Sequence, residues 1–132
     1  SLPLTGTGDE TRDFTYVLDL VQGLIKAAFY DDAIGQAFNL ASGKETKIKD
    51  MIAMVNQSTG NSTEITRFPP RKWDTKKRLL ASIELAGKLI DYKPIVSFED
   101  GLNENFKWFS NNWDKVQLSA DFPAGMSSAV RK

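Results

Sequence analysis

A segment near the N-terminus changes from strand periodicity to helix periodicity without a break. Over residues 11–16, polar side chains alternate with a row that holds Arg12, Phe14 and Tyr16, as in an extended strand. From Val17 to about Asp31 the apolar residues recur with helical spacing instead, at Val17, Leu20, Val21, Leu24, Ile25 and Ala28. A strand that passes directly into an amphipathic helix predicts a mixed α/β unit.

Predicted strands and helices also alternate along the rest of the chain. Short apolar runs predict strands over 36–41 and 63–68. Helices are expected between Thr46, as the N-cap, and Gly60, and again from Ser82 to a point before Pro94. A fourth helix is expected to begin at the capping-box-like stretch Ser97–Asp100. Periodicity is lost after Trp113, which predicts a domain over 1–113 and a mobile tail over 114–132.

Composition narrows the range of possible functions. The 132 residues suit one compact domain, and 17 basic residues balance 17 acidic ones, so neither nucleic acid nor a membrane is an expected partner. The chain has no cysteine and no histidine, which excludes zinc fingers, thiol nucleophiles and imidazole bases. No metal site is predicted, and a cytoplasmic location is expected.

Four segments between Gly6 and Phe109 form a recognisable series. They read GTGDETRDFTYVLDLVQGL, FNLASGKETKI, RFPPRKWD and KLIDYKPIVSFEDGLNENFKWF. In order and spacing they resemble the extended short-chain dehydrogenase/reductases, the NAD-dependent nucleotide-sugar epimerases and dehydratases similar to UDP-glucose 4-epimerase. The resemblance implies the C-terminal substrate-binding portion of that α/β fold, without most of the Rossmann domain. Asp91 departs from the pattern, because it stands where the family usually has a left-handed glycine.

Two elements of the family's chemistry are missing from this sequence. The Gly-rich turn that holds the NAD pyrophosphate is absent, since Gly6-Thr7-Gly8 follows no apolar strand and opens no helix. None of the three tyrosines has a lysine four residues later, as Y-x-x-x-K requires. NAD is therefore implied for the parent enzyme only, and the chain alone is not expected to hold a cofactor or to contain catalytic residues.

By the same resemblance, the substrate-binding candidates are Arg12, Arg71 and Asp74. The two arginines would approach the diphosphate of a nucleoside diphosphate sugar from different sides and neutralise it with planar forks of donors. Asp74 would orient Arg71 or accept a hydrogen bond from a ribose hydroxyl. Each residue also has a structural interpretation: Arg12 in an exposed ion pair, Arg71 in a solvated loop and Asp74 as a turn cap. Lys76, Lys77 and Arg78 are interpreted as a solvated face.

Two hypotheses from different classes follow. In the first, the chain is the nucleotide-sugar-binding part of an epimerase or dehydratase, inactive alone, with the N-terminal Rossmann half as its partner. In the second, it is a stand-alone binding or assembly module that kept the fold without the chemistry. The predicted strand 36–41 would leave an unpaired edge in an isolated chain, so a homodimer is possible. The sugar, the nucleobase and the reaction type are left open.

Overall fold

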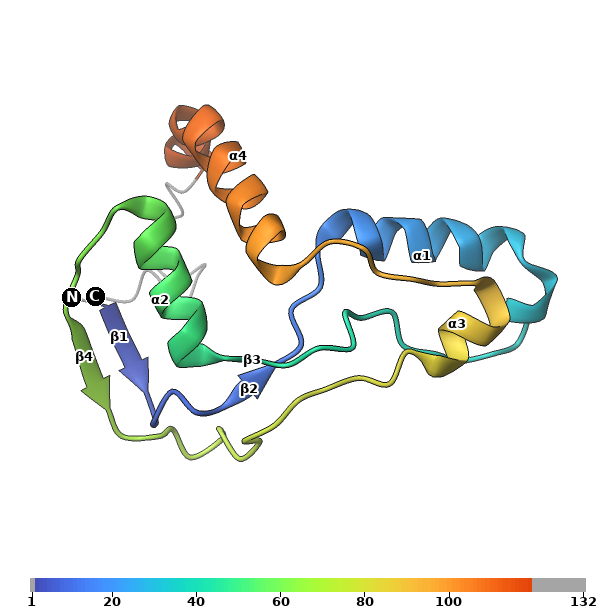
Figure 1. Cartoon of the computed structure of the whole chain (residues 1–132), viewed down its shortest axis with the longest axis horizontal. Helices are drawn as coiled ribbons and strands as arrows, with labels where there is room; N and C mark the ends of the chain where they lie inside the picture. The colour runs from blue at the N-terminus through green and yellow to red at the C-terminus, as the bar shows by residue number, and fades with distance from the viewer. Residues whose placement is uncertain (1, 120–132) are drawn as a thin grey trace.

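The computed structural model describes residues 2–119 as an elongated arrangement of short strands and helices (Figure 1). In chain order the elements are β1 (Leu2–Thr5), β2 (Thr11–Arg12), α1 (Val17–Phe29), a 3₁₀ turn (Asp31–Ala33), β3 (Thr46–Lys47), α2 (Ile48–Thr59), β4 (Ile65–Phe68), α3 (Glu84–Ile90) and α4 (Phe98–Ser119). The predicted α/β class is confirmed.

Two small sheets form one end of the molecule. β1 pairs in parallel with β4, with Leu2 opposite Ile65 and Thr5 opposite Phe68. β2 pairs antiparallel with β3, and α2 begins directly after β3. Leu4 of β1 and Ile52 of α2 are buried here. The strand β1 is not among the elements expected from the sequence.

A second cluster of buried residues lies at the other end of the long axis. Ala86, Ile90 and Tyr92 are buried, and Tyr92 donates a hydrogen bond of 3.1 Å to the backbone oxygen of Ala41. Asp91 ends α3 in the left-handed conformation with φ of 48°, so this residue does take the place of the usual glycine. The turn directs Tyr92 back into the cluster.

The predictions of a strand over 11–16 and of a strand over 36–41 are wrong. The strand over 11–16 is limited to β2, because the Asp13 carboxylate turns the chain by accepting hydrogen bonds from the amides of Ser42 and Gly43, at 2.9 and 3.0 Å. The segment 36–41 is irregular, since no other described segment pairs with it as a strand. It contributes side chains to the second cluster instead, with Phe38 and Leu40 half-buried against it.

The predicted helices agree with the structure better than the predicted strands do. α1 begins at Val17 and ends at Phe29, just before Asp31, and Gly60 ends α2 with φ of 63°. Thr46 is not the N-cap of α2, because it lies in β3 and the helix starts two residues later. α4 continues through 114–119, where a tail was predicted; residues 120–132 of that tail lie outside the described residues.

Gly23 allows α1 to approach the second cluster closely. A Cβ atom at this position would lie 2.7 Å from Leu40 Cδ2 and 2.8 Å from Tyr92 Cε2. Gly23→Ala should therefore lower the free energy of unfolding by about 1–3 kcal/mol, measured by urea denaturation. Gly87→Ala is the matched control, because its Cβ would meet only the Tyr92 oxygen at 3.7 Å. An equal effect of both substitutions would contradict this packing.

Candidate functional site

A pocket of about 690 Å³ lies between β1, β2, the start of α2 and the loop that follows β4. All three residues predicted from the sequence line it: Arg12 from β2, and Arg71 and Asp74 from the loop. Ile48 and Met51 of α2 supply part of its apolar wall. The pocket therefore combines an apolar surface with two guanidinium groups, as a ligand with an apolar part and an anionic part requires.

The backbone holds β2 from both sides. Besides its pairing with β3, Thr11 donates its amide to the oxygen of Lys77 at 2.9 Å and accepts from the amide of Leu79 at 3.2 Å. Arg12 is half-buried, and its Nη1 donates to the Thr11 oxygen at 2.7 Å. Thr11 is thus bonded to the segment after β4, and Arg12 itself pairs with Thr46 of β3, so the backbone that carries this pocket-lining arginine is held on both sides.

Asp74 orients Arg71, as one of the sequence interpretations predicts. Arg71 donates from Nε to Asp74 Oδ2 at 2.7 Å and from Nη2 to Oδ1 at 3.2 Å. This two-point pair raises the pKa of the Arg71 guanidinium, with the hydrogen bond to Asp74 as the largest cause. The guanidinium also lies 5.8 Å from the centre of the Trp73 ring. Within the described part of the chain, Arg71 Nη1 donates no hydrogen bond, and Asp74 is the carboxylate with which Arg71 forms an ion pair.

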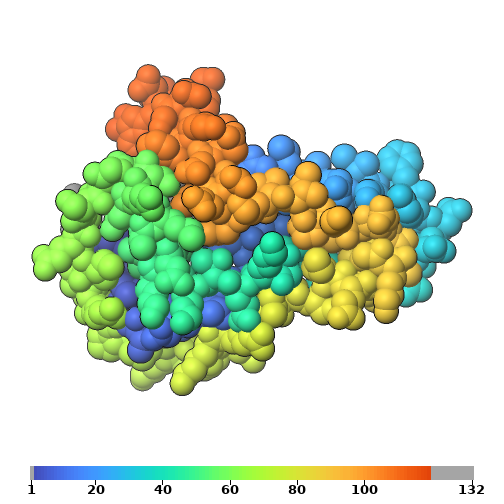
Figure 2. Space-filling model, in the orientation of Figure 1, coloured from blue at the N-terminus to red at the C-terminus, as the bar shows by residue number. Residues whose placement is uncertain are grey.

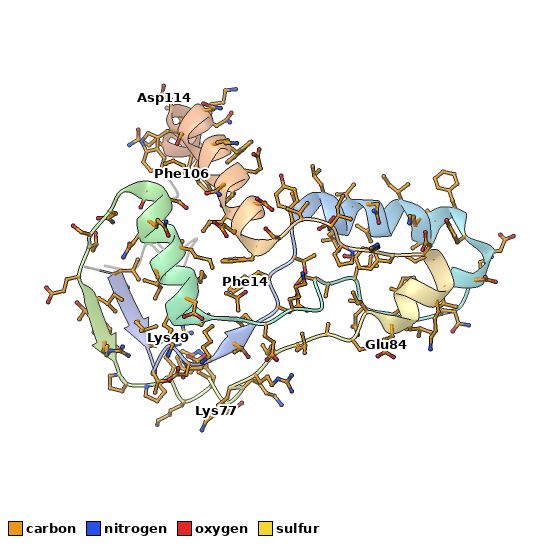
Figure 3. All side chains as sticks on the ribbon, viewed as in Figure 1. Phe14, Lys49, Lys77, Glu84, Phe106 and Asp114 are labelled. Carbon is orange, nitrogen blue, oxygen red and sulfur yellow. The ribbon has the colours of Figure 1, made fainter. Side chains whose placement is uncertain are left out.

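The pocket has two cationic residues that the sequence analysis assigned to a solvated face. Lys76 and Lys77 line it together with the two arginines, against two carboxylates, Glu10 and Asp74. Figure 3 labels Lys77 on the loop that passes β2, with Lys49 at the start of α2. Four cationic groups against two anionic ones favour an anionic ligand. The sequence alone does not reveal that Lys76 and Lys77 line a pocket, because consecutive basic residues look the same in a solvated loop.

The Gly6-Thr7-Gly8 turn does not fit a dinucleotide phosphate. Both glycines have positive φ, of 85° and 84°, but the turn leads into β2 and not into a helix. The Glu10 carboxylate accepts hydrogen bonds from the amides of Gly8, at 2.8 Å, and Thr7, at 3.4 Å. The amides that could cradle a phosphate are therefore already bonded to an anion, and no step of NAD chemistry is assigned to this turn.

Arg78 has a separate, structural role next to the pocket. It donates from Nε and Nη2 to the two oxygens of Glu45, each at 2.7 Å, and Thr11 donates its hydroxyl to Glu45 at 2.6 Å. These hydrogen bonds, the one from Arg78 first, lower the pKa of Glu45 from 4.5 to about 2. The pair ties the segment after β4 to the loop before β3.

This pair predicts a pH dependence of stability. The folded pKa of Glu45 lies below its ordinary value, so its contribution is complete above about pH 4.5 and is lost as the pH falls toward 2. We expect Glu45→Gln to flatten the fall in melting temperature over that interval, measured by circular dichroism. Glu104→Gln is the control, because Glu104 pairs with Lys107 within α4 and makes no contact with the pocket. An unchanged slope in Glu45→Gln would refute the prediction.

The sequence and the fold match known proteins over one part of their length. No protein-family model matches the chain. It is 29% identical to UDP-glucuronic acid decarboxylase 1 of Xenopus tropicalis, over 99% of this chain and 30% of that protein. Among solved structures, epimerase Mth375 of Methanothermobacter thermautotrophicus has 44% identity and a TM-score of 0.86, over 89% of this chain and 35% of that one. UDP-glucuronic acid 4-epimerase of Bacillus cereus, solved with UDP-glucuronic acid and NAD, has 29% identity and a TM-score of 0.76, over 83% and 35%.

The relatives and solved structures that the chain matches belong to the extended short-chain dehydrogenase/reductase family, and the match covers a stretch of them consistent with a C-terminal part. Its relatives within that family are UDP-sugar epimerases and decarboxylases. The chain spans about a third of the length of the relatives it matches. Within residues 2–119, no helix is long and apolar enough to cross a membrane, and no group of three or more potential ligand side chains could hold a metal ion.

Proposed function

We propose that this chain is the nucleoside-diphosphate-binding part of an NAD-dependent nucleotide-sugar epimerase or dehydratase. The observation that carries the proposal is the convergence of Arg12, Arg71 and Asp74 on one pocket. These residues come from two regions about 60 positions apart in the sequence, and each lies in a segment that resembles the family's motifs. The bound UDP-sugar of the Bacillus cereus relative supports a ligand of this class.

The residues have distinct roles in the proposed complex. Arg12 and Arg71 donate N–H groups to phosphate oxygens, and a charge-assisted bond of this kind is roughly twice as strong as a neutral one. Asp74 holds the Arg71 fork with two of its donors, so that Nη1 remains directed to the ligand. Lys76 and Lys77 add positive charge around the diphosphate. The apolar wall from α2 faces the uncharged part of the nucleotide.

The reaction itself needs groups outside this chain. NAD, when bound to the whole enzyme, supplies the hydride acceptor, and we assign none of its contacts to the residues described. The isolated chain is therefore proposed to bind nucleotide without turning over a sugar. The stand-alone binding module, the homodimer and the cytoplasmic location stay predictions from the sequence.

Isothermal titration calorimetry with UDP and with uridine tests the proposal. Because the two arginines contact the diphosphate, we expect UDP to bind at least tenfold more tightly than uridine. The difference should shrink as the salt concentration rises. Equal affinity for the two ligands, or no binding of UDP at millimolar concentration, would contradict the proposed function.

A further inference from the structure

Trp73 is a large aromatic side chain on the surface of the loop after β4. It is 74% exposed, so it does not help to fill a core. Figure 2 shows this loop, in yellow-green, along the lower outer edge of the molecule. The described residues that line the pocket include Arg71 and Asp74, on either side of Trp73, but not Trp73 itself. The tryptophan is therefore next to the pocket without forming part of its wall.

The turn over residues 71–74 brings the Trp73 ring to the guanidinium group of Arg71. The amide of Asp74 donates to the oxygen of Arg71 at 3.0 Å, and the amide of Thr75 donates to the oxygen of Trp73 at 2.9 Å. The centre of the ring lies 5.8 Å from Arg71 Cζ, which is within the range of a cation–π contact. Backbone hydrogen bonds of the loop thus hold the two residues in positions from which their side chains meet.

The ion pair with Asp74 is by itself a weak restraint on Arg71. The Arg71 side chain is 53% exposed, and an ion pair in contact with water is weakened by solvation, by salt and by the entropy of the long side chain. The Trp73 ring adds a second contact from a different side chain. Asp74 accepts from Nε and Nη2, so Nη1 is the donor nitrogen that has no partner among the described residues.

We propose that Trp73 is a positioning residue, whose ring holds the Arg71 guanidinium in the orientation that presents Nη1 to a phosphate oxygen. The inference rests on the proposed function, because it takes a phosphate group as the partner of Arg71. A restrained side chain loses less conformational entropy when the ligand binds, and the affinity rises accordingly. Trp73 adds no contact to the ligand, so its effect is confined to ligands that carry a phosphate group.

The mobility of the Arg71 side chain without ligand tests the restraint itself. In Trp73→Leu we expect the NMR order parameter of Arg71 Nε to fall toward the value of about 0.6 or less that marks a flexible group, although Asp74 is retained. Trp73→Phe should keep most of the order, because phenylalanine still offers an aromatic ring to the cation. The Nε of Arg78, which is bonded to Glu45, is the internal control and should not change. An unchanged order parameter of Arg71 in Trp73→Leu would overturn the inference.

Calorimetric titration of the variants tests the effect of the restraint on binding. We expect Trp73→Leu to weaken UDP binding by about 2- to 5-fold, which corresponds to a cation–π contact at an exposed site. The affinity for uridine should stay the same, because uridine has no phosphate group. In an Arg71→Ala background, Trp73→Leu should have no further effect on UDP, since the tryptophan acts through the arginine. Trp113→Leu is the matched control, because Trp113 is 53% exposed on α4 and is not among the residues that line this pocket.

The other outcomes separate this inference from the proposed function. An equal loss of UDP affinity with and without Arg71 would assign Trp73 a direct contact with the ligand, and a parallel loss of uridine affinity would assign that contact to the base; either would overturn the inference. The same UDP affinity in Trp73→Leu as in the unsubstituted chain would also overturn it. No binding of UDP by the unsubstituted chain, with Arg71 still ordered by Trp73, would refute only the proposed function, because the order parameter is measured without a ligand.

Discussion

Arg12→Ala should weaken UDP binding by about 10- to 100-fold, since a hydrogen bond to a charged group contributes about 1.5–3 kcal/mol. The side chain is half-buried, and its strand β2 is held by β3 on one side and by the segment after β4 on the other. Arg12→Lys should recover only part of the affinity, because a lysine presents no planar fork to the phosphates. Calorimetric titration of the variants with UDP measures the effect.

Arg67→Ala is the matched control for Arg12→Ala. It removes the same charge from an exposed arginine of β4, which donates to the Thr7 oxygen at 2.8 Å and does not line the pocket. We expect less than a threefold change in UDP affinity, because only the long-range field of the chain is altered. If both variants lost affinity equally, net charge and not the geometry of the pocket would explain the binding.

Asp19→Ala should be the most destabilising of these substitutions, by about 2–4 kcal/mol. The change leaves two backbone amides, those of Ile95 and Val96, without their acceptor beneath α1. It also frees the segment that connects α3 to α4. Urea denaturation measures the free energy of unfolding.

Asp50→Ala is the control for Asp19→Ala. It measures how much stability is lost when an acidic residue is removed from the first turn of a helix without removing an acceptor for backbone amides. Asp50 lies in the first turn of α2, as Asp19 does in α1, but its side chain is exposed. We expect a loss of about 0.3–1 kcal/mol, the usual contribution of an acidic residue near a helix N-terminus. A loss in Asp19→Ala no larger than in Asp50→Ala would show that the two amides find other acceptors.

Local signals in the sequence predicted the helices better than the strands. The bounds of α1, the glycine that ends α2 and the left-handed Asp91 depend on a few neighbouring residues, so they can be predicted from the sequence. A strand depends on its partner as well. The segment 36–41 has the composition of a buried strand, yet no described segment pairs with it. β1 was missed because four residues with one proline carry almost no periodic signal.

The residues of the candidate site could be selected through resemblance, and the other residues that line the pocket could not. Arg12, Arg71 and Asp74 follow from family-like motifs, and the structure places them around one pocket. The contribution of Lys76 and Lys77 depends on how the loop after β4 folds over β2, which no local pattern encodes.

A crystal structure of this chain with UDP bound would show directly whether the nucleotide occupies the pocket beside β2. We expect the diphosphate in the pocket beside β2, with phosphate oxygens within hydrogen-bond distance of Arg12 and of Arg71, and with the Arg71–Asp74 pair intact. A diphosphate bound at any other surface, or in the pocket without contact to either arginine, would contradict it.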